Sequence, residues 1–463
     1  MPSYFVGRQV LNRQYIWSSL TLLFINLVSV APAFSAGFAL AAQSGTGLGN
    51  AFAGMTATSK DASNQFYNPA SLSFLSPERQ LSAGGMLIFP NVELKDGTAT
   101  NVVLGTAVTG GDGGNAGSPK FTQNFYLASE QFGKFRYGLG VTSPYGLGNA
   151  YDKNWMGRYH ADESKLRTLD INPAFSYQLT DRISLGLGLS IQYAQLNTKS
   201  VIDSSAICLY SAPSPACAAV GLGRPGNAAV DSYAELEGND ISGGFNMGIM
   251  FKATSALSLG LAYRSAIEHE IEGDADFDLS RQMTRFVSVA RSTSFRDTHF
   301  KSRIKLPEQL TFGMHYKPNE NWDLLADLAF TGWSRFETVE VEFDNPSQPT
   351  AKVNHDWNDS WRVSLGATRR LNDKWKFKTG LSYDRTPIPN ASLRTVGIPD
   401  ADRITVAMGL NREINKNMRA ELAYAHLFGG DAEIRTTNAT GHALRGDMDI
   451  SADLVAFQLI RKF

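Results

Sequence analysis

The sequence predicts an all-β protein: a transmembrane antiparallel β-barrel of about fourteen strands, with an N-terminal plug, or hatch, inside its lumen. Three observations lead to this prediction. Apolar residues alternate with small or polar ones in many segments, short polar turns recur between long connections, and the chain ends in an alternating segment with a terminal phenylalanine. Glycine is abundant, with 42 among 463 residues, and the mean hydropathy of −0.19 is too polar for a bundle of membrane helices.

Residues 1–35 have the features of an export signal. Arg8 and Arg13 supply a positive start, and residues 17–30 form a mostly apolar segment that is too short for a transmembrane helix. Ala33 and Ser35 are the small residues expected before a cleavage site, which places cleavage before Ala36. The alternative is an uncleaved anchor. No apolar run of about 18 residues follows, so we expect an exported chain without a membrane-spanning helix.

Residues 36–79 do not alternate and are rich in Gly, Ala and Ser. A barrel of fourteen strands has a wide lumen, which must be plugged or else forms an open channel. We therefore predict that residues 36–79 are the plug and that residues 80–463 are the barrel. Within the plug, Asn68-Pro69-Ala70 predicts a helix start, because Asn caps helices and Pro suits the first helical position.

The clearest alternation runs from Ile183 to Tyr193, where every odd residue is apolar and every even one is small or polar. Residues 257–264, 361–366 and 404–411 repeat the pattern. A strand sends successive side chains to opposite faces. A soluble β-sandwich would turn the apolar face inward and a transmembrane barrel would turn it towards lipid, so the alternation alone leaves both open.

Six tight turns favour the membrane barrel. They lie between alternating segments, whereas the other connections, such as 197–239 and 277–300, are long. Short turns at one end and long loops at the other are typical of outer-membrane barrels, and six tight turns imply seven further hairpins and hence fourteen strands. The turns are 132–135, 180–182, 254–256, 319–321, 372–374 and 415–417. We interpret Trp322, Trp333 and Trp375 as an interfacial girdle.

The chain ends on an alternating segment in which Val455, Phe457, Leu459 and Phe463 share one face, as expected of a closing strand; Arg461 interrupts it.

Cys208 and Cys217 are the two cysteines of the chain, and both lie in the 197–239 connection. An exported protein meets an oxidising compartment, so we predict a local disulfide, with two unpaired thiols as the alternative. Their spacing fits no zinc motif.

Other classes of function find little support. The net charge of −1 gives no basis for binding nucleic acid. Residues 45–50 lack the third glycine of a dinucleotide-binding motif, no Gly-x-Ser-x-Gly motif occurs, and the seven histidines are scattered. We therefore expect no enzyme activity, no cofactor and no metal. An open porin for polar solutes is a rival, against which the plug argues, and a lipid hydrolase would need a Ser/His/acid arrangement.

The mature chain resembles the FadL family of outer-membrane transporters of hydrophobic compounds. Each shared motif is weak by itself, but the order and spacing of the motifs together are specific. These are 36–38, 44–54, 67–72, 143–147, 263–265, 306–308, 332–336, 383–389 and 398–403. The resemblance implies a fourteen-stranded barrel with a hatch. It also implies uptake of long-chain fatty acids, or in some members of aromatic hydrocarbons, with sideways exit into the membrane.

The resemblance also implies site residues. Asn68, Pro69 and Ala70 match the hatch motif, Phe38 would contact or replace a ligand in a lumenal pocket, and Ser143 would hydrogen-bond its carboxylate. An outer groove would form between 197–239 and the loop centred on 277–300. In the family, basic residues lie near the ligand carboxylate in that groove. The matching positions of this chain are Ser200 and Asn354, which are not basic, so the neighbouring Lys199 and Lys352 are the candidate substitutes. We expect passive uptake by a monomer in the bacterial outer membrane, in contact with lipid and lipopolysaccharide.

Overall fold

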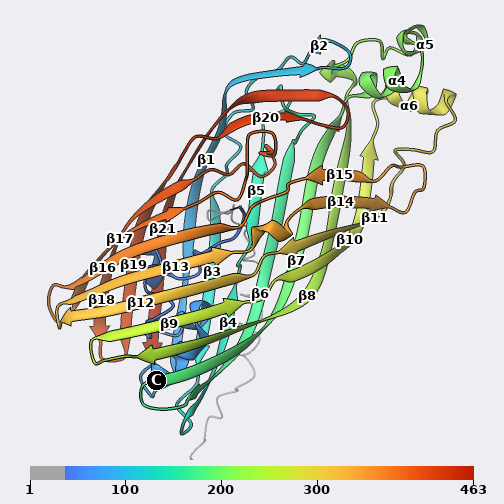
Figure 1. The fold of residues 1–463 in the computed structure, drawn as a ribbon. Coiled ribbons are helices and arrows are strands. Elements are labelled where there is room, and N and C mark those ends of the chain that lie inside the picture. The colour runs from blue at the N-terminus through green and yellow to red at the C-terminus, as the bar shows by residue number, and fades with distance from the viewer. Residues whose placement is uncertain (1–36) are drawn as a thin grey trace, which may run out of the picture.

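The computed structural model describes residues 37–463; the predicted signal peptide and its cleavage site lie outside the described residues. The described chain forms a closed antiparallel barrel that encloses its N-terminal segment (Figure 1). The barrel closes where β1 pairs with β21, from Gln80 opposite Lys462 to Asn101 opposite His442. No helix among residues 37–463 is both long and apolar enough to cross a bilayer.

The barrel wall has fourteen passes among the described residues, of which three are broken into two strands. They are β1 (Gln80–Asn101), β3 (Lys120–Ala128), β4 (Phe135–Thr142) with β5 (Gly146–Ala150), β6 (Glu163–Gln178), β7 (Ile183–Ile202), β8 (Ser232–Lys252), β9 (Leu257–Arg264) with β10 (Ile267–Asp278), β11 (Thr298–Leu306) with β12 (Gln309–Asn319), β13 (Trp322–Thr331), β16 (Ser360–Arg370), β17 (Trp375–Asp384), β18 (Arg403–Asn415), β19 (Met418–Gly429) and β21 (His442–Lys462). The predicted strand number is confirmed.

Shorter elements lie inside the barrel or at its long-loop end. Inside are α2 (Gly45–Leu48), α3 (Asn64–Tyr67) and the 3-10 helix η1 (Pro69–Phe74). The long-loop end carries β2 (Thr106–Ala107), β14 (Thr338–Phe343), β15 (Ala351–Asn354), β20 (Glu433–Thr437), α4 (Ser204–Ser211), α5 (Ser214–Ala219), η2 (Ala228–Val230), α6 (Arg281–Val289) and η3 (Trp333–Arg335).

The direction of the side chains decides between sandwich and membrane barrel. On β7, the apolar residues from Leu185 to Ile191 are 42–56% exposed, whereas Ser184, Ser190 and Gln192 are at most 3% exposed. The apolar face thus points outward, the reverse of a soluble protein, and forms a surface suited to lipid. The barrel is therefore a membrane barrel.

All six predicted tight turns join neighbouring strands at one end of the barrel. The long connections are more regular than expected, because β7 continues to Ile202, β8 already starts at Ser232, and α6 forms within 277–300. The sequence pattern missed these strand ends because they extend beyond the apolar band. Their outward residues are polar there and inward ones such as Leu236 are apolar, so the pattern of the lipid region is reversed.

The upper limit of the apolar band is marked on β9–β12. Below the breaks at 265–266 and 307–308, Leu261, Leu310 and Phe312 point outward. Above them, β10 and β11 pair four outward acids with four outward bases in register. The pairs are Glu268 with Lys305, Glu270 with Arg303, Glu272 with Lys301 and Asp274 with His299. This ladder of charges belongs in water, so the wall stands clear of the hydrocarbon region above these breaks.

The predicted tryptophan girdle is only partly confirmed. Trp322 and Trp375 lie near the tight turns, where Arg369 and Arg412 stack over their rings. Trp333 contradicts the interpretation, since it is fully buried in the lumen. Its burial depends on partners far away in the sequence, which local spacing does not reveal.

Cys208 on α4 and Cys217 on α5 form a disulfide at the long-loop end. Both are buried in an apolar cluster with Leu222, Val230 and Met283 of α6, so the two loops predicted to form a groove pack against each other.

We expect both cysteines to resist alkylation under denaturing conditions unless a reductant is added, and intact mass to show one disulfide. Replacing both cysteines by serine should destabilise the folded outer loops by roughly 2–4 kcal/mol. The barrel should still migrate as folded in a heat-modifiability gel. Alkylation of both thiols in protein isolated without reductant would contradict the pairing.

Candidate functional site

Residues 37–79, which we call the hatch segment, lie inside the barrel and are almost entirely buried (Figure 1). Hydrogen bonds attach the segment to several parts of the wall. Asn50 donates to the carbonyls of Ala367 and Thr379, and Gln65 donates to that of Leu139. The lumen is therefore filled at this level by a segment fixed on opposite sides.

The hatch motif lies against two wall glycines. A Cβ on Gly186 would lie 2.1 Å from the nitrogen of Ala70, and one on Gly248 would lie 2.1 Å from Oδ1 of Asn68. Glycine in the alternating strands thus permits a close approach of the hatch backbone, a reason that the sequence alone did not reveal. Asn68 caps η1 as predicted, accepting from the Ala70 N–H at 3.0 Å, and also donates to the carbonyl of Ile249 on β8 at 3.1 Å.

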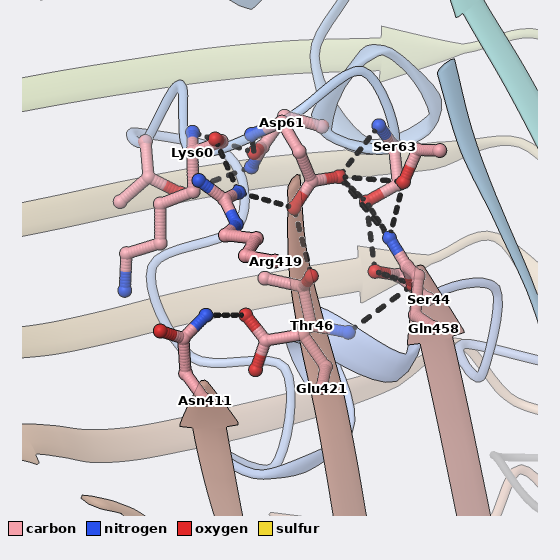
Figure 2. A network of polar contacts seen from close by, with 12 residues as sticks. Ser44, Thr46, Lys60, Asp61, Ser63, Asn411, Arg419, Glu421 and Gln458 are labelled. Atoms are coloured by element: carbon pink, nitrogen blue, oxygen red, sulfur yellow. Dashed lines mark hydrogen bonds and ion pairs between the residues drawn. The ribbon is translucent and has the colours of Figure 1, made fainter. Parts of the chain in front are cut away.

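Asp61 is the centre of a buried polar network between the hatch segment and the wall (Figure 2). Its carboxylate accepts from the hydroxyls of Thr46 at 2.7 Å and Ser63 at 2.5 Å. From the wall it accepts from Gln458 on β21 at 3.2 Å and pairs with Arg419 on β19 at 3.1 Å. Burial raises the pKa of Asp61, but Arg419 and the hydroxyl hydrogen bonds outweigh it, so the pKa lies below the ordinary value.

A second buried ion pair adjoins this network. Lys378 on β17 lies 2.7 Å from Glu421 on β19 and also donates to the carbonyl of Thr46 at 3.1 Å. Asn411 donates to the other oxygen of Glu421 at 2.6 Å (Figure 2). Each buried charge is thus paired and hydrogen-bonded, as burial of a charge requires.

Above the hatch helices, Phe38 lies in an aromatic cluster and is 1% exposed. Its ring centroid lies 4.8 Å from that of Trp333, 5.3 Å from Phe336, 6.0 Å from Trp357 and 6.2 Å from Tyr145. We call these five residues the aromatic cluster. All five belong to one buried apolar core. The hatch segment supplies Phe38, the central ring of the aromatic cluster.

The broken third pass holds Phe38 in place. Between β4 and β5 the chain turns inward, where the Leu40 N–H donates to the carbonyl of Pro144 at 2.7 Å and Gly146 donates to that of Phe38 at 3.0 Å. Ser143 and Gln43 exchange two hydrogen bonds, at 2.7 and 3.1 Å. Ser143 therefore lies at this break, next to the residues that carry Phe38.

The motifs shared with the family converge around the aromatic cluster. The Tyr145 hydroxyl donates to the carbonyl of Pro307, and Asp400 accepts from the N–H of Gly37 at 3.2 Å while pairing with Arg403 at 2.8 Å. Segments 143–147, 306–308, 332–336 and 398–403 thus meet at one place, although the chain separates them widely.

Three buried ring nitrogens in and beside this cluster have no hydrogen-bond partner among residues 37–463. They are Nε1 of Trp333, Nε1 of Trp357 and Nδ1 of His355. The His355 ring stacks on Phe336 at 4.6 Å, and burial lowers its pKa to about 4, so the ring is neutral at physiological pH. Sequence reasoning missed Trp357 and His355, which no motif includes, and assigned Trp333 of the 332–336 motif to an interfacial girdle.

Lys199 and Lys352 lie at the long-loop end, as expected for an outer groove, but a carboxylate already holds each of them. Lys199 pairs with Glu235 at 3.1 Å and Lys352 with Glu340 at 2.7 Å. Both are exposed, so their role in binding a ligand stays a prediction. Residues 37–463 contain no group of three or more His, Cys, Asp or Glu side chains arranged to hold a metal ion.

Comparison with known proteins agrees with this architecture. The family model described as outer membrane protein transport protein (OMPP1/FadL/TodX) matches residues 26–463. A long-chain fatty acid transport protein of Salmonella typhi is 28% identical, over 87% of this chain and 89% of its own, and that of Escherichia coli K12 is 27% identical over 87% and 90%.

Solved structures show the same fold. A Pseudomonas aeruginosa FadL homologue superposes with a TM-score of 0.84 at 21% identity, covering 92% of this chain and all of its own. The toluene transporter TodX of P. putida gives 0.66 at 18% identity, covering 93% and 99%. The chain therefore belongs to the OMPP1/FadL/TodX family of outer-membrane transport proteins.

Proposed function

We propose that this chain carries hydrophobic small molecules passively across the outer membrane, with long-chain fatty acids as the main cargo. Its relatives named as long-chain fatty acid transport proteins support the cargo class. Aromatic hydrocarbons are the second candidate, because the aromatic cluster offers a cage of rings and a structural neighbour is named a toluene transporter. We also infer that the chain works as a monomer among outer-membrane lipid and lipopolysaccharide.

The observation that carries the fatty acid proposal is the pair of unpartnered indole N–H groups of Trp333 and Trp357 beside Phe38, to which His355 adds a third donor in the tautomer that carries its hydrogen on Nδ1. A carboxylate accepts hydrogen bonds from such donors, and a hydrocarbon does not. An apolar chain would be stabilised by burial against the rings, at roughly 25 cal/mol per Å². In this proposal the ligand displaces Phe38 and its head group meets His355, Trp333 or Trp357.

The proposed route begins between the loops that carry α4 and α6, continues to the aromatic cluster, and leaves sideways at the broken third pass. There β3 pairs with β4 only through 125–128, and β5 pairs with β6. Apart from the Gly117–Asn149 bridge, no partner strand borders β5 on its other side among the described residues. Withdrawal of residues 38–40 from Pro144 and Gly146 would free this break towards the membrane.

The test is uptake of labelled oleate and labelled toluene by cells that produce the Trp357→Phe variant in place of their own transporter. The substitution keeps a six-membered aromatic ring and removes the pyrrole ring with its N–H. Losing a hydrogen bond to a charged group costs about 1.5–3 kcal/mol, so oleate uptake at limiting concentration should fall about tenfold or more, while toluene uptake stays unchanged.

Trp361→Phe is the matched control, because Trp361 lies on the outer face of β16 and is 38% exposed. An equal fall in the uptake of oleate and of toluene would mean that the aromatic cluster recognises only the apolar surface of a ligand. Unchanged oleate uptake with a folded barrel would refute the role of the N–H group.

A further inference from the structure

A cavity lies between the hatch segment and the tight turns, at the opposite end of the lumen from the long loops. It has a volume of about 570 Å³ and is bounded by residues 57–60 and 254–256, by Phe74, and by inward residues of β8, β9, β12, β13 and β16–β19. We call it the lower cavity. Thr56 borders a separate polar cavity above, and Ala57 and Thr58 border the lower one. The chain from 56 to 58 is thus part of the partition between them.

The lower cavity is strongly basic. Two acids, Asp323 and Glu421, face it, against six bases. The bases are Lys60, Lys252, Lys317, Lys376, Lys378 and Arg419. Like charges that face one cavity repel one another unless an anion compensates them.

The carboxylates near the cavity are already engaged. Glu421 holds Lys378, and Asp61 holds Arg419, as described above. Asp323 accepts from His315 at 3.0 Å and lies 4.0 Å from Lys60. Lys376 lies 3.9 Å from Glu413.

Lys252 and Lys317 are left without a carboxylate. Within residues 37–463, no carboxylate oxygen lies within 4.0 Å of either ammonium. The Lys252 ammonium lies 3.8 Å from the centroid of the Phe74 ring, and Met250 is buried nearby on the same strand. Burial, followed by the charge of Lys378, lowers the pKa of Lys60 to about 8, against the opposing effect of Asp323 and Glu421.

We propose that the lower cavity is a binding site for a small organic carboxylate. Lys252, Lys317 and Lys60 receive the carboxylate as charge-assisted hydrogen-bond donors, and its apolar part lies against Phe74 and Met250. This site is separate from the aromatic cluster and goes beyond the proposed uptake function. It would bind carboxylates at the end of the barrel that faces the periplasm, where short turns lie in such proteins.

Acetylation of Lys60 provides the test. At pH 8 a large share of this amine is neutral and reactive, and its modification by the neutral reagent N-hydroxysuccinimidyl acetate can be followed by peptide mass spectrometry on the full-length protein in detergent. Hexanoate is the probe, with hexan-1-ol and inorganic phosphate as comparisons. We expect hexanoate to slow acetylation of Lys60 and not that of Lys416 in the exposed 415–417 turn, because a bound carboxylate covers Lys60 and raises its pKa.

A double variant identifies the site. Lys252→Gln with Lys317→Gln should weaken the protection by hexanoate about tenfold, equivalent to about 1.4 kcal/mol. Lys134→Gln, in an exposed turn outside the cavity, should leave it unchanged. Equal protection by hexan-1-ol or by phosphate, no protection at all, or full protection in a folded double variant would each overturn the proposal. None of these results depends on whether the protein transports oleate.

Discussion

Replacing Gly186 with valine is expected to push the hatch segment away from the wall and to open the lumen to ions, while the barrel itself stays folded. The first carbon of the new side chain would lie 2.1 Å from the nitrogen of Ala70 and 2.4 Å from the carbonyl carbon of Pro69. Both are backbone atoms, so no side chain can simply rotate out of the way. Overpacking of this kind typically costs about 1–3 kcal/mol, and moving the hatch relieves it.

The measurement is conductance of the purified variant in a planar bilayer, beside a heat-modifiability gel that reports folding. Gly243→Val is the matched control. Gly243 is on the adjacent strand β8, faces outward, and would place its Cβ no closer than 3.7 Å to another group. A Gly186→Val barrel that folds and conducts no more than the control would show that the hatch tolerates displacement from this wall.

The Asp61→Ala substitution is expected to release the lower part of the hatch segment. It removes the only carboxylate that pairs with Arg419 among the described residues and leaves that charge partly buried. Breaking a buried ion pair by removing one partner costs about 3–5 kcal/mol. Amide hydrogen exchange should therefore accelerate in residues 44–64, whereas the strands keep their protection. Asp373→Ala, which changes a turn carboxylate whose side chain is 93% exposed, should leave exchange unchanged.

The same network predicts a pH dependence. The pKa of Asp61 in the folded protein lies below the ordinary carboxyl value of 3.8. Its stabilising contribution is thus fully present above that value and is lost only as the pH falls through the lowered pKa. Hatch protection in the unmodified protein should stay constant from neutral pH down to about pH 4 and weaken below it. A loss of protection that begins near neutral pH would show that another group controls the hatch.

The fold could be predicted from the sequence because its main signals are local. A tight turn such as 372–374 and the alternation around Leu187 are each contained in a few neighbouring residues. The upper ends of β7 and β8 escaped prediction, since their outward residues are polar there and their inward residues, such as Leu196 and Leu236, are apolar, the reverse of the pattern in the lipid region. Trp333 was misplaced for a different reason: its environment is set by Phe38, which no local pattern connects to it.

The candidate site was less predictable. Resemblance to the family pointed to Phe38 and Ser143, but the buried ring nitrogens of Trp357 and His355 depend on how distant loops pack. The bases of the lower cavity come from the hatch segment and from strands β8, β12, β17 and β19, which lie far apart in the sequence. Their common environment emerges only when the barrel closes.

The position of Gln458 has a consequence for assembly. This residue lies on the last strand, pairs in register with Gly84 of the first, and accepts at one oxygen from the backbone N–H groups of Gly45 and Thr46. The seam that closes the barrel is therefore in direct contact with the hatch segment. Joining the two ends of a long chain carries a large loop-closure entropy, and the hatch offers the incoming terminal strand a template that rewards one register over its neighbours. The N-terminal segment thus favours correct closure of the barrel during folding, a role that is independent of any transported ligand.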